Sequence, residues 1–450
     1  MNLSKFKNKH FLALIGNLVI SGFSVLTIAL LYRLFKEKSD MGIWFFFLTV
    51  SGLADAIRNG FLTTATVKFY AGTTKERGNA VLGSVWYLAM FLTLGIALLS
   101  FVVLAFSSFI QSEQLLIVLK WLGITFISSL PFSVTFWILI SEEDYLKILG
   151  LRFINSGGMI ATIVVLALLH KASLQNILLV NVVTNIVTSV VAIVLGYSKI
   201  DKLKYKTKAL VQEIMHFGKY SLSTNMSANL LSTVNTFLIT FMLGPATLAI
   251  YNAPQRLMEI VEIPLRSFVG TGMSAMATAY NNNNMYHLVH VTKKYAGVLC
   301  LAFIPIIIVV LVGADYAVLL LGGGKYAGTE AANILRMLIV VSFLYPIDRF
   351  NGVTLDIIQQ QKINLYKVLI MLATNIPVTY LGILWLQNIW GAAIAIPFTT
   401  LAGLIFGYYH LRKHIDYTIG GIFKTGFVES RNLFYEKILP KLPFKKAKLS

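Results

Sequence analysis

Charged residues and cysteine are scarce in this sequence, and both scarcities narrow what the protein can be. Only 13% of the 450 residues are charged, whereas 57% are hydrophobic and the mean hydropathy is +0.74. Soluble domains carry about 25% charged residues. The composition therefore excludes an ordinary soluble globular protein. The single cysteine, Cys300, has no partner for an internal disulfide bond.

Signatures of catalysis are also missing. The sequence has no metal-ligand cluster, no nucleophile–base pair and no nucleotide-binding fingerprint, and its seven histidines are scattered. The "GGGK" segment ending at Lys325 lacks the spacing and the hydroxyl residue of a phosphate-binding loop. We therefore expect no enzyme activity, no cofactor and no metal. A membrane glycan polymerase or ligase is disfavoured, because such enzymes usually need a sizeable outward catalytic loop and the outward loops expected in this chain are short.

Long apolar runs are abundant, and they predict an all-α integral membrane protein. A transmembrane helix needs about 20 consecutive apolar residues, and runs of this length recur along the whole chain. We expect about twelve transmembrane helices, near residues 11–33, 41–64, 79–107, 115–140, 148–170, 174–198, 213–243, 247–279, 290–313, 330–358, 364–386 and 389–411.

The net charge of +19 is concentrated in loops on one side of the predicted spans. Lys and Arg gather at the start, around residues 199–208 and after residue 412, all on the side shared by both termini. The positive-inside rule therefore predicts that both termini are cytoplasmic. Because the basic residues are spread over short loops, we expect no nucleic-acid partner.

The organisation of the chain suggests two halves. The polar stretch at residues 198–213 leaves six expected spans on each side, and residues 43–61 show a spacing similar to that of residues 250–268. We expect two six-helix bundles, residues 1–208 and 209–412. A basic cytoplasmic tail, residues 413–450, follows and is either amphipathic on anionic lipids or disordered.

One expected span carries an unusual set of charges, in the stretch "YNAPQRLMEIVEIPLRSF" at residues 251–268. Facing lipid, each charge near the membrane centre would cost about 2.5–3.5 kcal/mol. The stripe must therefore face protein or a water-filled cavity. Its members, at helical spacing on one face, are Asn252, Gln255, Arg256, Glu259, Glu262 and Arg266.

Other expected spans carry smaller stripes. Arg256 with Glu259, and Asp55 with Arg58, lie three residues apart and could neutralise each other, and Asp348 and Arg349 could pair with neighbours, whereas Arg266 has no adjacent acid. Both structural pairing and a role in a cavity therefore remain open. The planar fork of arginine suits phosphate, which favours an anionic substrate. The candidate substrate-binding residues are Arg58, Arg256, Arg266, Arg349, Lys219, Asn225, Asn229, Asn252 and Gln255.

The stretch at residues 251–268 and the later "SFLYPIDRFNGVTLDIIQQQK" resemble the oligosaccharide repeat-unit flippases of O-antigen and exopolysaccharide synthesis. These belong to the multidrug/oligosaccharidyl-lipid/polysaccharide exporter superfamily. The resemblance implies a V-shaped pair of bundles in the bacterial cytoplasmic (inner) membrane. It implies movement of an undecaprenyl-pyrophosphate-linked oligosaccharide from the inner to the outer leaflet by alternating access.

The resemblance also implies roles and partners. Cavity arginines would bind the pyrophosphate, and Arg58, Arg256, Arg266 and Arg349 match that role by position. Ion coupling would fall to Asp55, Glu259, Glu262 or Asp348. Anionic membrane lipids and the polysaccharide polymerase machinery are the implied partners. The alternative is a cation-coupled multidrug exporter, although the first span lacks the acid that proton-coupled exporters commonly keep there.

Overall fold

The structure is a computed structural model that describes residues 9–433 and 435, without the side chains of residues 9–18, 20, 219–229, 231–232 and 433. In this part of the chain the regular structure is helical and no strand occurs. Contacts divide the chain into two compact units, residues 1–249 (unit 1) and 250–450 (unit 2). Each unit is described by itself.

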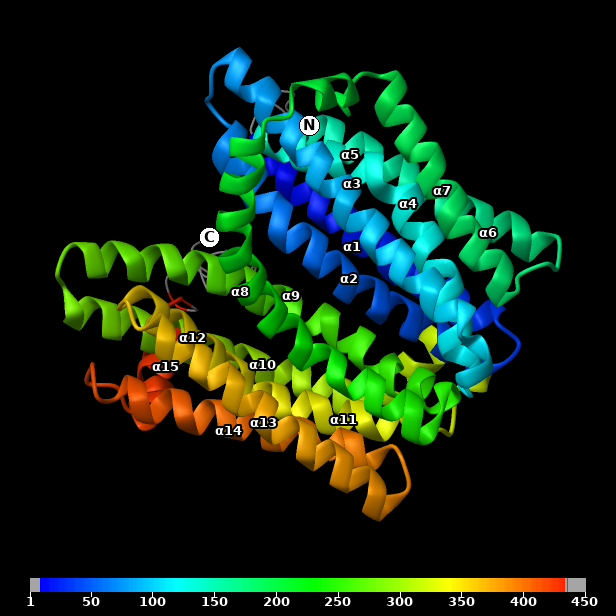
Figure 1. Ribbon diagram of the computed structural model, residues 1–450. Helices are drawn as coiled ribbons and strands as arrows, with labels where there is room; N and C mark the ends of the chain where they lie inside the picture. Colours follow the sequence, from blue (N-terminus) through cyan, green and yellow to red (C-terminus); the bar gives the residue numbers. More distant parts are fainter. Residues whose placement is uncertain (1–8, 434, 436–450) are drawn as a thin grey trace, which may run out of the picture. The chain divides into compact units, whose positions relative to one another are not determined.

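Unit 1 is a bundle of long helices joined by short turns (Figure 1). Side-chain caps start several of them: the hydroxyls of Ser112, Ser173 and Thr207 each accept a hydrogen bond from an N–H of the first helical turn. Its helices are α1 (Lys9–Leu34), α2 (Lys38–Tyr70), α3 (Lys75–Ala105), α4 (Glu113–Ser141), α5 (Tyr145–Arg152), α6 (Gly158–Leu168), α7 (Leu174–Val194), the 3₁₀ segment η4 (Ile200–Tyr205) and α8 (Lys208–Leu243).

Unit 2 begins within α9, a single helix that continues through Pro254 and Pro264. Its helices are α9 (Pro245–Asn281), α10 (Met285–Gly322), α11 (Ala331–Val341), α12 (Tyr345–Ile357), α13 (Gln361–Leu386), α14 (Trp390–Leu411) and α15 (Ile419–Leu433).

Every expected span overlaps one helix or two consecutive helices. Nine helical segments of the described residues are long and apolar enough to cross a membrane: α2, α3, α4, α5–α6, α7, α10, α11–α12, α13 and α14. The expected all-α membrane protein is confirmed at this level. The count of twelve spans in two six-helix bundles stays a prediction.

The contact division differs from the predicted halves. Helix α8 packs along α2, where the ring of Phe237 lies 5.3 Å from that of Phe46. The division therefore falls after Ala249, beyond α8, whereas the polar stretch in the sequence suggested residue 208. A polar loop marks where the chain leaves the membrane; it does not reveal which helix the next span contacts.

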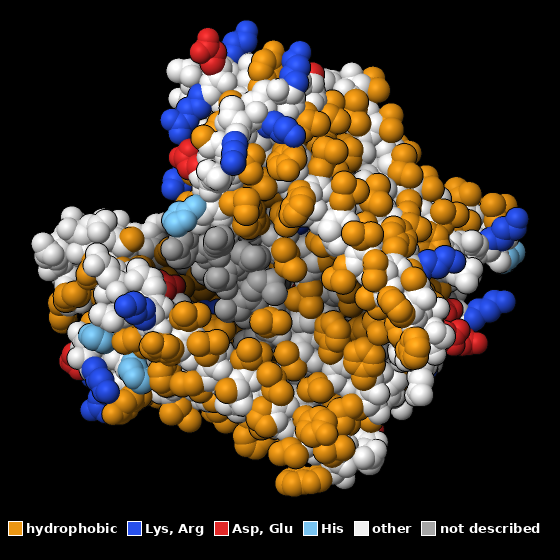
Figure 2. All heavy atoms as spheres, viewed as in Figure 1, with side chains coloured by type: hydrophobic (Ala, Val, Ile, Leu, Met, Phe, Trp, Pro, Cys, Tyr) orange, Lys and Arg blue, Asp and Glu red, His pale blue; other side chains and the backbone are white. Residues whose placement is uncertain are grey.

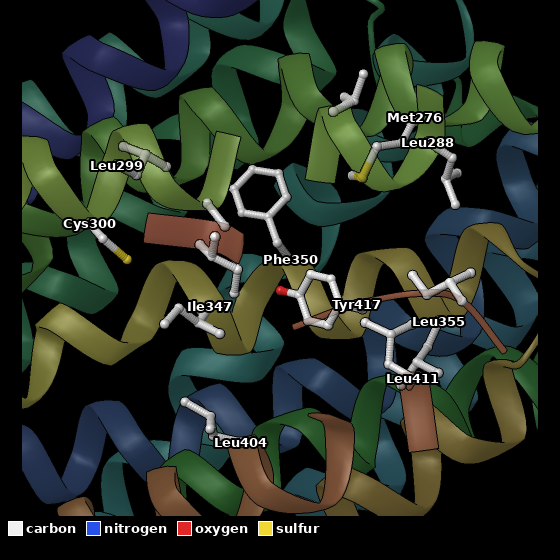
Figure 3. Packing of buried hydrophobic residues seen from close by; sticks show 14 of the residues in the cluster. Met276, Leu288, Leu299, Cys300, Ile347, Phe350, Leu355, Leu404, Leu411 and Tyr417 are labelled. Carbon is white, nitrogen blue, oxygen red and sulfur yellow. The ribbon is translucent and has the colours of Figure 1, made fainter. Parts of the chain in front are cut away.

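The core of unit 2 joins helices that are far apart in the sequence. Phe350 of α12 is fully buried, and Figure 3 shows it beside Tyr417, within a cluster that also contains Met276 of α9. A Cβ at Gly272 of α9 would lie 2.7 Å from the Phe350 ring, so only glycine permits this approach. This packing holds α9, with its charged stripe, beside α12.

The tail helix α15 is held against α10. A Cβ at Gly426 would lie 2.6 Å from the Cα of Gly297, so the two backbones touch. Glu429 of α15 pairs with Lys294 (2.5 Å) and lies 3.3 Å from the ring of His290. The Lys294 hydrogen bond holds the pKa of Glu429 below its ordinary value. Residues 419–433 of the tail therefore pack on unit 2, and the predicted contact with lipid stays a prediction.

We expect Gly426→Leu to release α15, because the new side chain would occupy the space of the α10 backbone. Amide hydrogen exchange, read by mass spectrometry, should show α15 losing most of its protection. Gly420→Leu is the matched control, since a Cβ at Gly420 of the same helix meets open space. Equal protection of α15 in both variants would contradict the docking.

Candidate functional site

The charged stripe of α9 is arranged as two ion pairs. Arg256 pairs with Glu259 (2.6 Å), and Arg266 pairs with Glu262 (3.1 Å). Separations of three and four residues bring each acid to its base on one face of the helix, and only the first of these pairs was predicted from the sequence. Pairing lowers the cost of placing four charges on a membrane helix.

The two arginines of α9 differ in what they can still bind. The side chain of Arg266 is 69% exposed, against 26% for Arg256. A guanidinium has five N–H donors, and the hydrogen bond from Arg266 to Glu262 uses one of them. Arg266 can therefore hold an incoming anion while it keeps its bond to Glu262, or exchange one for the other.

A third ion pair lies between α12 and α13. Lys367 Nζ lies 2.6 Å from Asp348 Oδ1 and donates to the backbone oxygen of Asp348 (3.0 Å). Both side chains are buried, at 5% and 13% exposure. A Cβ at Gly407 would lie 3.3 Å from Lys367 Cδ, so this glycine leaves room for the lysine stem. Asp348 is thus neutralised inside unit 2.

Lys367 is the residue that sequence reasoning missed. It was not among the candidate residues, although it lies inside the span expected at residues 364–386. A lysine inside an apolar span, with an acid on the preceding helix, is the signal that could have identified the pair.

Arg349 is the predicted cation whose charge is most available to a ligand. It is exposed and makes no ion pair within the part of the chain that the structure describes. Val261 of α9 and Tyr345 of α12 pack against one hydrophobic cluster, which contains Leu265 and Phe350. Unit 2 therefore brings the end of the α9 stripe close to the charged part of α12.

In unit 1, Arg58 is enclosed by α2, α3 and α4. Its residue exposure is 1%, and its guanidinium pairs with Asp55 (2.8 Å). It also donates to Ser133 (2.8 Å) and Ser129 (3.2 Å) and lies 4.6 Å from the centre of the Phe126 ring. These contacts satisfy the charge within unit 1.

The two members of the unit 1 ion pair differ in their exposure. Asp55 is 41% exposed, whereas Arg58 is enclosed. Arg58 fixes the position of the Asp55 carboxylate. The predicted contact of Arg58 with substrate stays a prediction.

The remaining candidate residues lie on α8 and α9. Asn252 and Gln255 are partly buried on α9. Lys219, Asn225 and Asn229 lie outside the residues whose side chains the structure describes. Among the described residues, no group of three or more His, Cys, Asp and Glu side chains could hold a metal ion.

Comparison with known families decides the classification. The model of the family described as "Polysaccharide biosynthesis protein" matches residues 30–331, more than half of the chain. The chain belongs to this polysaccharide biosynthesis family. The resemblance inferred from the charged stretches is thereby confirmed. None of the curated proteins searched matches the chain.

Solved structures share the fold of this family member. An inward closed structure of the lipid II flippase MurJ is 15% identical with a TM-score of 0.73, covering 94% of this chain and 91% of the other. An inward-facing multidrug resistance MATE family transporter of the MOP superfamily is 16% identical with a TM-score of 0.70, covering 87% and 94%. A MOP superfamily transporter from Pyrococcus furiosus is 14% identical with a TM-score of 0.53, covering 90% and 93%. At such identities the likeness shows the fold alone.

Proposed function

We propose that this protein is a flippase for a lipid-linked oligosaccharide of surface polysaccharide synthesis. Its cargo is an undecaprenyl-pyrophosphate-linked glycan, which it moves from the inner to the outer leaflet of the bacterial cytoplasmic membrane by alternating access. Membership of the polysaccharide biosynthesis family supports the pathway, and the fold shared with a lipid II flippase supports the transport of a lipid-linked substrate.

One observation carries the choice of an anionic cargo. Arg349 is exposed without an ion pair among the described residues, and the exposed Arg266 extends from the same region of unit 2 through its partner Glu262. Two arginine forks that still have free N–H donors provide the bidentate contacts that pyrophosphate oxygens accept. A neutral cargo would gain nothing from them.

The ion pairs of α9 suggest how the cargo is held and released. Glu262 pairs with Arg266, so the cation is already positioned before cargo arrives. An arriving pyrophosphate competes with this carboxylate, and Glu262 regains its partner when the cargo leaves. Exchange of one anion for another keeps the arginine charge compensated throughout.

The four candidate carboxylates Asp55, Glu259, Glu262 and Asp348 are each paired with a base. A coupling ion or proton would therefore act by displacing a base from its carboxylate. Glu259 and Asp55 are the more exposed of the four, and they are the better candidates.

The proposed function also includes an orientation in the membrane and a set of partners. Both termini face the cytoplasm, where the lysine-rich segments meet anionic lipids. The polysaccharide polymerase machinery would take over the cargo on the outer side. No enzyme activity is assigned to this chain.

A cation-coupled multidrug exporter is the second candidate, because the fold is also that of MATE family transporters. Exporters of cationic drugs need exposed acids in excess of bases. The stripes of α9 and α12 contain four acids and three arginines, but three of the acids are paired with bases and Asp356 accepts hydrogen bonds from Asn364. The exposed Arg349 has no ion pair among the described residues, and this favours an anionic cargo.

Transport in proteoliposomes tests the proposal. A fluorescent oligosaccharide linked to undecaprenyl pyrophosphate should move between leaflets only in vesicles that contain the protein. The matched probe carries the same glycan on an uncharged polyprenyl glycoside, and it should stay in its leaflet. Movement of a cationic dye without movement of the pyrophosphate lipid would contradict the flippase and support the exporter.

A further inference from the structure

A polar cavity lies at one end of unit 1. Its volume is about 520 Å³, and it is enclosed by the end of α2, the first turns of α3, the end of α4 and the segment that begins at Lys199. Figure 2 shows Lys and Arg side chains gathered at this end of the unit. The distribution of basic residues predicts that this end is cytoplasmic.

The cavity wall contains a fixed lysine. Lys199 Nζ donates to the hydroxyl of Tyr70 (2.8 Å) and pairs with Glu142, and the same hydroxyl donates to Glu142 Oε1 (2.8 Å). Lys199 adopts a left-handed backbone with φ of 46°, which is uncommon for a residue other than glycine. These three side chains thus hold one ammonium group at the cavity surface.

The backbone that bears the lysines is clamped to α3. The indole N–H of Trp86 donates to the backbone oxygen of Ser198 (2.9 Å) in the interior of the unit. A Cβ at Gly83 would lie 2.5 Å from the backbone oxygen of Lys202, so α3 and η4 touch. Lys199 and Lys202 are therefore mounted on a rigid segment, not on a free loop.

The lining of the cavity is basic. Three lysines, Lys75, Lys199 and Lys202, line it against one acid, Glu142. Lys199 pairs with Glu142 and Lys202 pairs with the adjacent Asp201 (2.7 Å), so Lys75 supplies the charge that no acid compensates. Lys75 is exposed and makes no ion pair within the described residues, and the hydroxyl of Thr74 leaves the first N–H groups of α3 uncapped. The cavity thus offers ammonium groups and backbone donors around a space large enough for a phosphate ester.

We propose that this cavity binds a phosphate group at the membrane surface. Basic pockets between transmembrane helices on the cytoplasmic side suit the headgroups of anionic lipids. The same chemistry would accept a soluble phosphate. The residues that line the cavity include none of the α9 and α12 charges, so the inference does not depend on the identity of the cargo.

Two probes separate the sources of phosphate. The full chain is placed in nanodiscs containing phosphatidylglycerol or phosphatidylcholine, and the lipid that remains bound is measured by native mass spectrometry. In parallel, inorganic phosphate is titrated onto the protein in detergent while its melting temperature is followed. Retained phosphatidylglycerol alone supports a headgroup site, and a rise in melting temperature with phosphate supports a site that is also open to soluble anions.

The variant is Lys75→Gln with Lys202→Gln, which leaves the Tyr70–Glu142–Lys199 contacts intact. We expect about tenfold weaker binding of the phosphate probe, since each lysine near the surface contributes to the attraction. Lys36→Gln with Lys171→Gln removes the same charge from two exposed lysines outside the cavity and should change nothing. Binding that is absent for both probes, or equal in the two double variants, would overturn the proposal.

Discussion

Arg349→Glu should reduce transport of the pyrophosphate-linked glycan in proteoliposomes at least a hundredfold. The exposed guanidinium has no ion pair among the described residues, so its attraction is available to the cargo. Two unit charges 4 Å apart interact by about 4 kcal/mol near a protein surface, and the reversal turns attraction into repulsion. Arg349→Lys keeps the charge but loses the fork, and it should retain part of the rate.

Arg412→Glu is the control for this experiment. Arg412 is exposed in the turn after α14, and its reversal changes the net charge of the chain by the same amount. Transport should stay near the wild-type rate. An Arg349→Glu protein that is folded and transports normally would exclude Arg349 from the cargo site and would remove the main support for an anionic substrate.

Lys367→Met should destabilise unit 2 by about 3–5 kcal/mol, because it leaves the buried Asp348 carboxylate without its cation. The melting temperature in detergent, followed by intrinsic fluorescence, should fall by several degrees. Addition of Asp348→Asn to this variant removes the unpaired charge and should restore much of the loss, as the coupling in a double-mutant cycle.

Lys362→Met provides the comparison within the same helix, since Lys362 is exposed at the start of α13. It should melt as the wild type does. If Lys367→Met also melts as the wild type does, the ammonium and carboxylate do not stabilise each other in the folded protein. Asp348 would then be a candidate coupling carboxylate that Lys367 does not neutralise.

The helices could be predicted from the sequence because the membrane imposes a length on apolar runs. About 20 residues are needed to cross, and each run of that length became a helix or a pair of helices. The Arg256–Glu259 pair of α9 could also be predicted, since a separation of three residues places the two side chains on one face of a helix. The Arg266–Glu262 pair was missed, although a separation of four residues brings side chains together equally well.

Contacts between helices distant in the sequence could not be predicted. Nothing in the local pattern relates Gly297 to Gly426, although their backbones touch. The enclosure of Arg58 by Ser129 and Ser133 depends on how α4 packs against α2. Periodicity identifies the face of a helix that is polar. It does not tell whether that face meets a cavity or the hydroxyls of a neighbouring helix.

The sole cysteine has a practical consequence. Cys300 is 0% exposed within α10, packed in the core of unit 2. A thiol in that position is shielded from maleimide and spin-label reagents, so the native chain behaves as a cysteine-free background. Reporter thiols introduced on exposed residues of each unit can therefore be labelled selectively, and spectroscopic distances between them would follow the transport cycle without any change to the native core.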